Sequence, residues 1–85
     1  MKQINVDCAG MENSRQLHRA LAEALAFPEW YRYNLDALHD CLTDLAEETC
    51  LTLTGFSALP GFSRGFRRAM EDAQEENPNL TVIMK

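Results

Sequence analysis

The side chains best suited to chemistry lie close together, between residues 27 and 44. Asp36, Asp40 and Asp44 recur at intervals of four residues, and His39 stands next to Asp40. On a helix, this spacing places three carboxylates along one face. Such a face could bind a basic group of another protein. With Asp36, His39 and Asp40 on one helical turn, it could also bind a metal ion.

An aromatic cluster directly precedes this acidic series. Four of the seven aromatic residues fall within seven positions, namely Phe27, Trp30, Tyr31 and Tyr33. Rigid aromatic surface beside charged groups is typical of binding hot spots. We expect Phe27 and one tyrosine to anchor the segment. For the remaining rings, a buried position and an exposed one both stay open.

The excess negative charge of the chain is local. The formal net charge is −5, and acidic and basic residues cancel over residues 1–27 and again over residues 49–85. Residues 28–48 hold every excess acid, with Arg32 as their single basic residue. Neutralising phosphates requires clustered Lys and Arg, so we expect no nucleic-acid binding. A basic protein is the expected partner.

The acidic series also works against the helix that carries it. Like charges four residues apart repel by about 0.2–0.5 kcal/mol per pair, and Asp is a poor helix former. Asp36 would be favoured by the helix dipole in the first turn, whereas Asp40 would not. A local cost without a local gain indicates function. A merely solvated acidic face is the alternative.

The pattern does not favour catalysis. The only other histidine, His18, adjoins the apolar Leu17 in a helical pattern and is expected to be structural. His39 and Cys41 are two residues apart on a helix and point to different sides, which excludes a nucleophile pair. No glycine-rich phosphate loop or nucleophile elbow is present. We expect no enzyme activity, no cofactor and no metal, with a small metal site at His39 as an alternative.

Hydrophobic periodicity predicts six elements. Alternating apolar residues indicate strands at residues 2–8 and 50–54, and a third, largely apolar strand covers residues 80–84. Helical spacing predicts one helix that is capped by Asn13 or Ser14 and ends near Pro28, and another that is capped by Asn34. A third helix follows Pro60 and Gly61. The order β-α-α-β-α-β predicts an α/β fold with a three-stranded parallel sheet.

Length and composition favour one domain over residues 1–85. Of the 85 residues, 46% are hydrophobic, and no run approaches the roughly 20 apolar residues that span a membrane. The polar and apolar alternation of residues 1–7 differs from a signal peptide, so we expect a cytoplasmic protein. The three cysteines form no CxxC pair and are expected to be packing thiols. They are Cys8, Cys41 and Cys50.

The run from Leu25 to Thr43, LAFPEWYRYNLDALHDCLT, resembles the signature of the barstar family of intracellular ribonuclease inhibitors. Pro-Glu followed by two aromatics, then Asn-Leu-Asp-Ala-Leu and Asp-Cys-Leu-Thr, form a long ordered match. Elsewhere the resemblance rests on the element order, the helix around Leu17 and the apolar last strand. It implies a three-stranded parallel sheet flanked by three to four helices. Residues 55–62 look shorter than the corresponding helical connection of the family.

The resemblance also implies a function. A monomeric protein would block a basic ribonuclease, a toxin or secreted enzyme, in a 1:1 complex, with Asp40 in place of a substrate phosphate. Asp36 matches a second interfacial aspartate, and Asp72 falls where the family offers a further acid. The implied partner-binding residues are Trp30, Asn34, Asp36, His39, Asp40, Thr43, Asp44 and Asp72.

Several positions depart from the family pattern. His39 and Leu45 each stand where the family has tryptophan, Asp44 replaces a glycine, and Trp30 replaces a tyrosine. We therefore expect a partner whose contact surface differs from that of the best-known target, and a pH-dependent contribution from His39. An acidic adaptor for a basic protein that is not a nuclease is the alternative.

Overall fold

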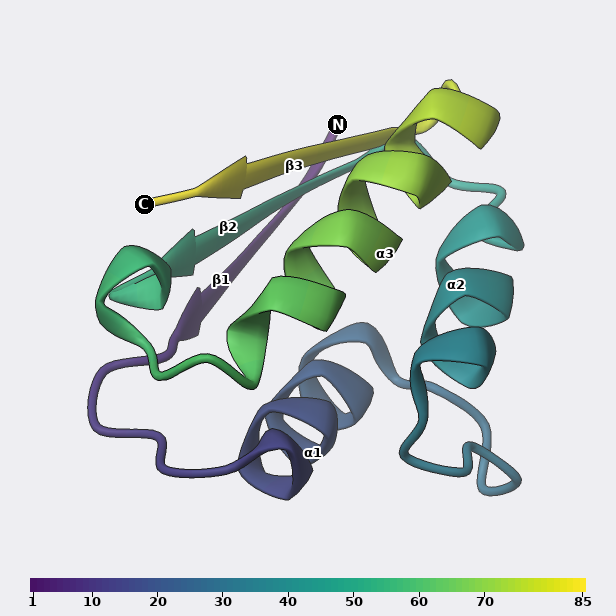
Figure 1. Ribbon diagram of the computed structural model, residues 1–85. Coiled ribbons are helices and arrows are strands. Elements are labelled where there is room, and N and C mark those ends of the chain that lie inside the picture. The colour runs from purple at the N-terminus through teal and green to yellow at the C-terminus, as the bar shows by residue number, and fades with distance from the viewer.

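The computed structural model describes residues 1–85 and contains three strands and three α-helices, with one short 3₁₀ helix (Figure 1). The predicted order β-α-α-β-α-β is confirmed. No helix combines the length and the apolar character needed to cross a lipid bilayer. The elements are β1 (Lys2–Asp7), α1 (Ser14–Leu25), α2 (Leu35–Thr43), β2 (Thr49–Thr54), η1 (Phe56–Ala58), α3 (Ser63–Glu76) and β3 (Leu80–Met84).

The strands form one parallel sheet, as predicted, and their order in the sheet is β1-β2-β3. Leu51 of β2 aligns with Ile4 of β1 on one side and with Val82 of β3 on the other. β1 ends one residue earlier than expected, and β2 begins one residue earlier. The 3₁₀ helix η1 was not expected, because three residues are too few to show a helical period.

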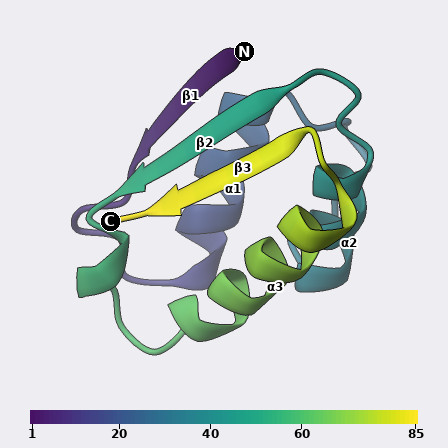
Figure 2. The same ribbon diagram turned by 90° about the horizontal axis from the view of Figure 1, so that it is seen from above.

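All helices lie on the same face of the sheet (Figure 2). α1 packs on β1 and α3 on β3, whereas α2 packs chiefly on α3 and stands farthest from the sheet. The opposite face is uncovered, although parallel sheets are usually covered on both faces. Alternation turns polar side chains to this open face, among them Gln3, Asn5, Thr54 and Thr81.

The edge strand β3 is partly protected by a neighbouring helix. The backbone N–H of Val82 donates a 2.5 Å hydrogen bond to Oε1 of Gln74 on α3. The side chain of Gln74 thus satisfies a backbone donor that edge strands usually leave to solvent or to a partner.

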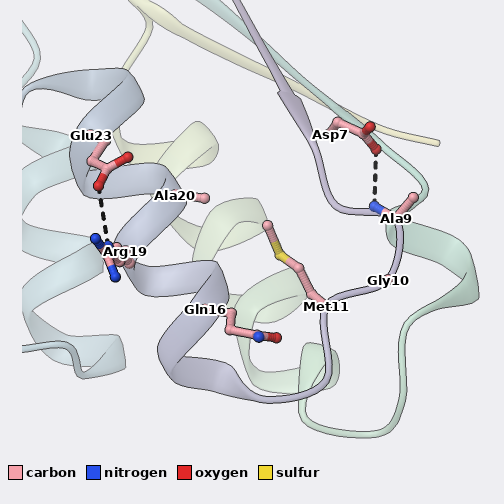
Figure 3. A pocket seen from close by; sticks show the side chains of 8 residues that line it. All are labelled: Asp7, Ala9, Gly10, Met11, Gln16, Arg19, Ala20 and Glu23. Carbon is pink, nitrogen blue, oxygen red and sulfur yellow. Dashed lines mark hydrogen bonds and ion pairs between the residues drawn. The ribbon is translucent and has the colours of Figure 1, made fainter.

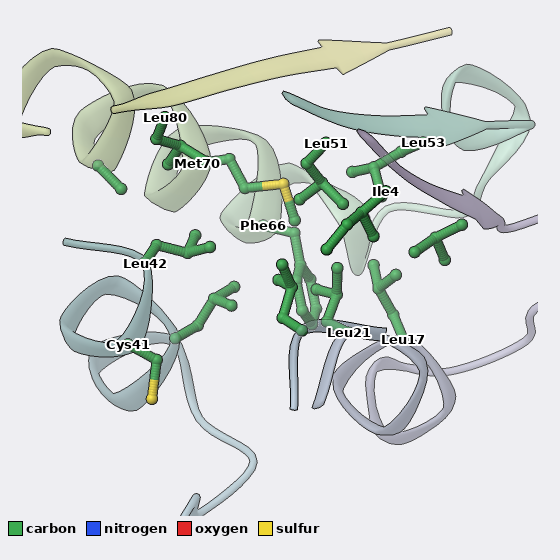
Figure 4. Close-up of a cluster of buried hydrophobic side chains, with 14 of the residues drawn as sticks. Ile4, Leu17, Leu21, Cys41, Leu42, Leu51, Leu53, Phe66, Met70 and Leu80 are labelled. Carbon is green, nitrogen blue, oxygen red and sulfur yellow. The ribbon is translucent and has the colours of Figure 1, made fainter. Parts of the chain in front are cut away.

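The core lies between the sheet and the helices (Figure 4). Leu51 and Leu53 of β2 are fully buried and face Leu17 and Leu21 of α1. Phe66 from α3 fills the centre of the same cluster. The three cysteines are free and buried, as expected for packing thiols.

α2 and α3 approach each other closely at one position. A Cβ atom at Gly65 of α3 would lie 2.6 Å from Cδ1 of Leu35, the first residue of α2. Glycine weakens a helix interior by about 1 kcal/mol relative to alanine. At residue 65 the absence of a side chain offsets this cost, because it lets the first turn of α2 pack against α3.

Candidate partner-binding surface

The outward face of α2 carries the acidic series, because the opposite face supplies the core. Ala37, Leu38, Cys41 and Leu42 are buried, whereas Asp36 and Asp40 are exposed. The backbone N–H of Ala37 donates a 2.7 Å hydrogen bond to Oδ1 of Asn34, which caps the helix as predicted. Capping fixes where α2 begins, and thus where its carboxylates stand.

The acids beyond the first turn occupy the negative end of α2. Asp40 lies in the last turn, and Asp44 is the C-cap residue, one position past the helix. The helix dipole disfavours both carboxylates at this end, whereas it favours Asp36 in the first turn. Thr43 donates its hydroxyl to the carbonyls of His39 and Asp40, at 3.0 and 3.1 Å. The negative end of the helix dipole therefore adds to the charges of Asp40 and Asp44.

The loop before α2 is anchored by one tyrosine, as expected. Tyr31 is 7% exposed, and its hydroxyl lies 2.5 Å from Nδ1 of His18 on α1. His18 also packs on the ring of Phe66 of α3, at 4.5 Å between centroids. Trp30 remains 58% exposed. The two neighbouring aromatic rings therefore have different roles: Tyr31 holds the loop, and Trp30 is free for contact.

Burial shifts the pKa values of the polar groups that hold the loop and of a neighbouring thiol. Burial lowers the pKa of His18 and raises the pKa of the Tyr31 hydroxyl, with further raising contributions from Cys41 and Tyr33. Burial also raises the pKa of the Cys41 thiol, and the carboxylates of Asp44 and Asp40 raise it further. The loop anchor is therefore neutral at neutral pH.

A groove of about 320 Å³ lies along the contact between α2 and α3. Asp36, His39 and Asp72 line it, which brings three of the predicted residues together from two helices. Arg68 also lines the groove, although none of its nitrogen atoms lies within 4.0 Å of a carboxylate. We call this feature the α2–α3 groove.

Glu76 joins this surface, although sequence reasoning did not select it. Its Oε2 atom lies 2.6 Å from Nε2 of His39, and the other ring nitrogen of His39 lies 3.9 Å from Oδ1 of Asp40. The imidazole therefore links the middle of α2 to the C-terminal end of α3. The available signal was the spacing of Asp72 and Glu76, which places both on one face of α3.

Trp30 borders a second, smaller hollow on the other side of α2. Its volume is about 170 Å³, and its lining combines loop residues with the C-terminal end of the helix. Asp44 is the only charged residue in the lining. We call it the Trp30 pocket. Its walls are Leu25, Ala26, Phe27, Pro28, Trp30, Cys41, Asp44 and Leu45.

The largest hollow of the molecule, about 380 Å³, lies elsewhere (Figure 3). It adjoins the end of β1 and the outer side of α1, and it contains none of the predicted partner-binding residues. Its charged groups already have partners: Arg19 pairs with Glu23 at 3.2 Å, and Asp7 accepts a hydrogen bond from the N–H of Ala9.

The predicted site residues thus form one strip over the loop, α2 and α3. Seven of them lie in the loop and on α2 or its C-cap, and Asp72 of α3 lines the α2–α3 groove together with Asp36 and His39. No group of three or more His, Cys, Asp or Glu side chains is arranged to hold a metal ion. The strip offers carboxylates and an exposed indole.

The sequence of the chain is similar to that of known proteins. A family model described as Barstar (barnase inhibitor) matches residues 1–84. A protein of Bacillus subtilis (strain 168) named "Putative ribonuclease inhibitor YrdF" is 36% identical over 81 residues. The similarity covers 89% of this chain and 89% of that protein.

Proposed function

Because the chain belongs to the barstar family, we propose that it inhibits a basic ribonuclease by occluding the active site of the enzyme. α2 and the loop before it form the occluding surface. Asp40 and Asp36 take the positions of RNA phosphates and pair with the cationic groups that bind substrate. Trp30 and its neighbours exclude water from those pairs.

One observation carries this proposal: the carboxylates of α2 are exposed and largely free of internal partners. Asp36 has no basic atom within 4.0 Å, and Asp40 has only Nδ1 of His39, at 3.9 Å. Burying a charge is costly unless it is paired, so these acids gain most from a cationic partner. The capped helix holds them in place before binding, which lowers the ordering cost.

The remaining predicted residues support the same surface. The Nδ2 group of Asn34 makes no hydrogen bond within the protein and is available to a partner, and Asp72 and Glu76 extend the acidic strip onto α3. Thr43 uses its hydroxyl hydrogen internally, so we assign it only an accepting role. We propose a 1:1 complex of a monomeric, cytoplasmic inhibitor that protects the cell from a toxin or secreted ribonuclease.

The proposal is tested by inhibition of RNA cleavage. The protein is mixed with a panel of cationic microbial ribonucleases, and cleavage of a fluorogenic RNA is followed as inhibitor is added. Stoichiometric blockade of at least one enzyme is expected. Binding to a cationic protein without loss of cleavage would contradict the proposal and indicate an acidic adaptor instead.

Substitutions then locate the surface. Asp40→Ala should weaken inhibition by about 2 kcal/mol or more, because it leaves cationic groups of the enzyme desolvated and unpaired, and Asp36→Ala should weaken it less. Glu23→Ala is the matched control, because Glu23 is an exposed acid on α1 that pairs with Arg19. Unchanged inhibition by Asp40→Ala would remove the assigned anchor.

A further inference from the structure

The Trp30 pocket combines three properties that together describe a ligand. Its walls are mostly apolar, an exposed indole borders it, and one carboxylate, Asp44, stands in its lining. Asp44 is exposed and takes part in no ion pair. It also lies at the negative end of the α2 dipole, where a carboxylate is least stable without a cation.

We infer that the Trp30 pocket receives one arginine side chain of the partner, in addition to the cationic groups that meet Asp36 and Asp40. This inference rests on the proposed function and identifies a second recognition element of the same surface. The guanidinium would lie against the indole of Trp30 and donate hydrogen bonds to the carboxylate of Asp44.

Size and chemistry favour arginine over the other candidates. An apolar cavity of about 150 Å³ holds a benzene-sized group, so a pocket of about 170 Å³ suits a planar group of that size. An aromatic side chain would fill the pocket and contact its apolar walls, but it would leave Asp44 desolvated and unpaired. A lysine ammonium is compact and strongly hydrated, whereas a guanidinium is planar, stacks on aromatic rings and pairs bidentately with carboxylates.

The Trp30 pocket is distinct from the α2–α3 groove. The α2–α3 groove contains Asp36, His39 and Asp72, whereas the Trp30 pocket shares none of these residues. The two hollows flank α2, so a partner that covers the helix contacts both. A cation in the Trp30 pocket would therefore select among partners that all satisfy Asp36 and Asp40.

The chain supplies its own reporter for this pocket, because Trp30 is its single tryptophan. N-acetylarginine amide is titrated into the intact protein while tryptophan fluorescence and the indole N–H resonance are followed. N-acetylcitrulline amide, which has a similar shape but no charge, and N-acetyllysine amide are titrated in parallel. We expect a saturable change with the arginine derivative, a smaller change with lysine and none with citrulline.

Two matched variants locate the response. Asp44→Asn should abolish most of it, whereas Asp36→Asn, which removes a carboxylate from the same helix but lines the other hollow, should leave it unchanged. Circular dichroism checks that both variants fold. Equal responses to arginine and citrulline, equal responses to arginine and lysine, or a full response in Asp44→Asn would overturn the inference.

The outcome is independent of nuclease inhibition. If a ribonuclease is blocked but the arginine derivative leaves Trp30 unaffected, the pocket assignment fails and the proposed function stands. If the arginine derivative binds but no ribonuclease is blocked, the pocket assignment stands and the proposed function fails. Where both succeed, Asp44→Asn should raise the dissociation constant of the nuclease complex about tenfold, as expected for a lost charge-assisted hydrogen bond.

Discussion

His18 shows how a single buried residue supports a surface that it does not touch. It is 3% exposed, and its Nδ1 atom forms a hydrogen bond with the hydroxyl of Tyr31, which lies in the same loop as Trp30. The groups around it are Tyr31 and Tyr33 of the loop, Phe66 of α3 and Arg15 over the ring of Tyr33. None of them is an acid that could compensate an imidazolium.

The stability of the protein should therefore fall in mild acid. Burial lowers the pKa of His18 below its ordinary value of 6.5, so the unfolded chain binds a proton more readily. The contribution of His18 to the free energy of unfolding should be constant above about pH 7 and should decrease as the pH falls below 6.5, by at most about 1.4 kcal/mol per pH unit. Urea unfolding at a series of pH values measures this slope.

The measurement is cleanest in a His39→Gln background, in which His18 is the only histidine. His18→Gln added to that background keeps a polar group that can reach Tyr31 but does not titrate. It should flatten the curve between pH 5.5 and 7. An identical slope with and without His18 would assign the acid sensitivity to the carboxylates instead.

At the level of elements, the ends of α2 and α3 are joined by one amide side chain. Asn77 is buried at the C-cap of α3, and its Nδ2 group donates hydrogen bonds to the carbonyls of Leu42 and Leu45, both at 3.0 Å. Its Oδ1 atom accepts a hydrogen bond from the N–H of Asn79. Asn77 thus adds a side-chain donor to the carbonyls at the end of α2, where the carbonyl of Leu42 also accepts a 3.5 Å hydrogen bond from the N–H of Leu45.

Replacing Asn77 should separate these two ends. Asn77→Ala removes a buried amide that donates to two carbonyls and should lower the free energy of unfolding by about 2–3 kcal/mol, measured by urea denaturation. Asn79→Ala is the matched control. It removes one exposed hydrogen bond to the carbonyl of Ala46 and should cost less than about 1 kcal/mol. Equal losses in the two variants would show that burial of the amide is not decisive.

The elements themselves followed from local rules, whereas their contacts did not. Alternation and helical spacing predicted all six long elements, and Asn34 and Asn13 cap their helices as expected. On α3, Arg67 and Arg68 form no ion pair with Glu71 or Asp72, the acids one turn further along the helix. Arg67 instead lies over the ring of Phe56 of η1.

The candidate site was predictable where it is continuous in sequence. Trp30 to Asp44 could be found from the charge and aromatic pattern and from the family signature. Glu76 could not, because its contact with His39 depends on how α2 and α3 pack. The distinction between exposed Trp30 and buried Tyr31 also required the position of His18, 13 residues before Tyr31.

For the whole molecule, negative charge is concentrated at one end. α2 and α3 end side by side, so their negative dipole ends add to the carboxylates of Asp40, Asp44 and Glu76. A standard interface covers about 800 Å² per partner, roughly a sixth of the 5147 Å² accessible surface. One complex can therefore cover the acidic strip and leave the open sheet face free.

This asymmetry should appear in association kinetics. The association rate with an inhibited ribonuclease should fall steeply as salt is raised, while the dissociation rate changes little. Stopped-flow fluorescence of Trp30 measures both. The double variant Glu47→Gln/Glu48→Gln, next to the end of α2, should flatten the salt dependence.

The matched control neutralises two acids far from that end, in Glu12→Gln/Glu23→Gln. It reduces the magnitude of the net charge by the same two units, from −5 to −3, and should reduce the slope less. If both variants behave alike, total charge and not its placement governs the encounter.

The hydrogen bond between Gln74 and Val82 hinders the addition of a further strand to this sheet. A strand arriving at the β3 edge would find one of the backbone donors it needs already occupied, and would first have to displace the glutamine amide. Intermolecular strand addition is thereby obstructed at β3, although the chain exposes Ile83 on the adjoining face. Loss of that amide would be expected to show first as aggregation on storage, before any change in how the acidic strip meets its target.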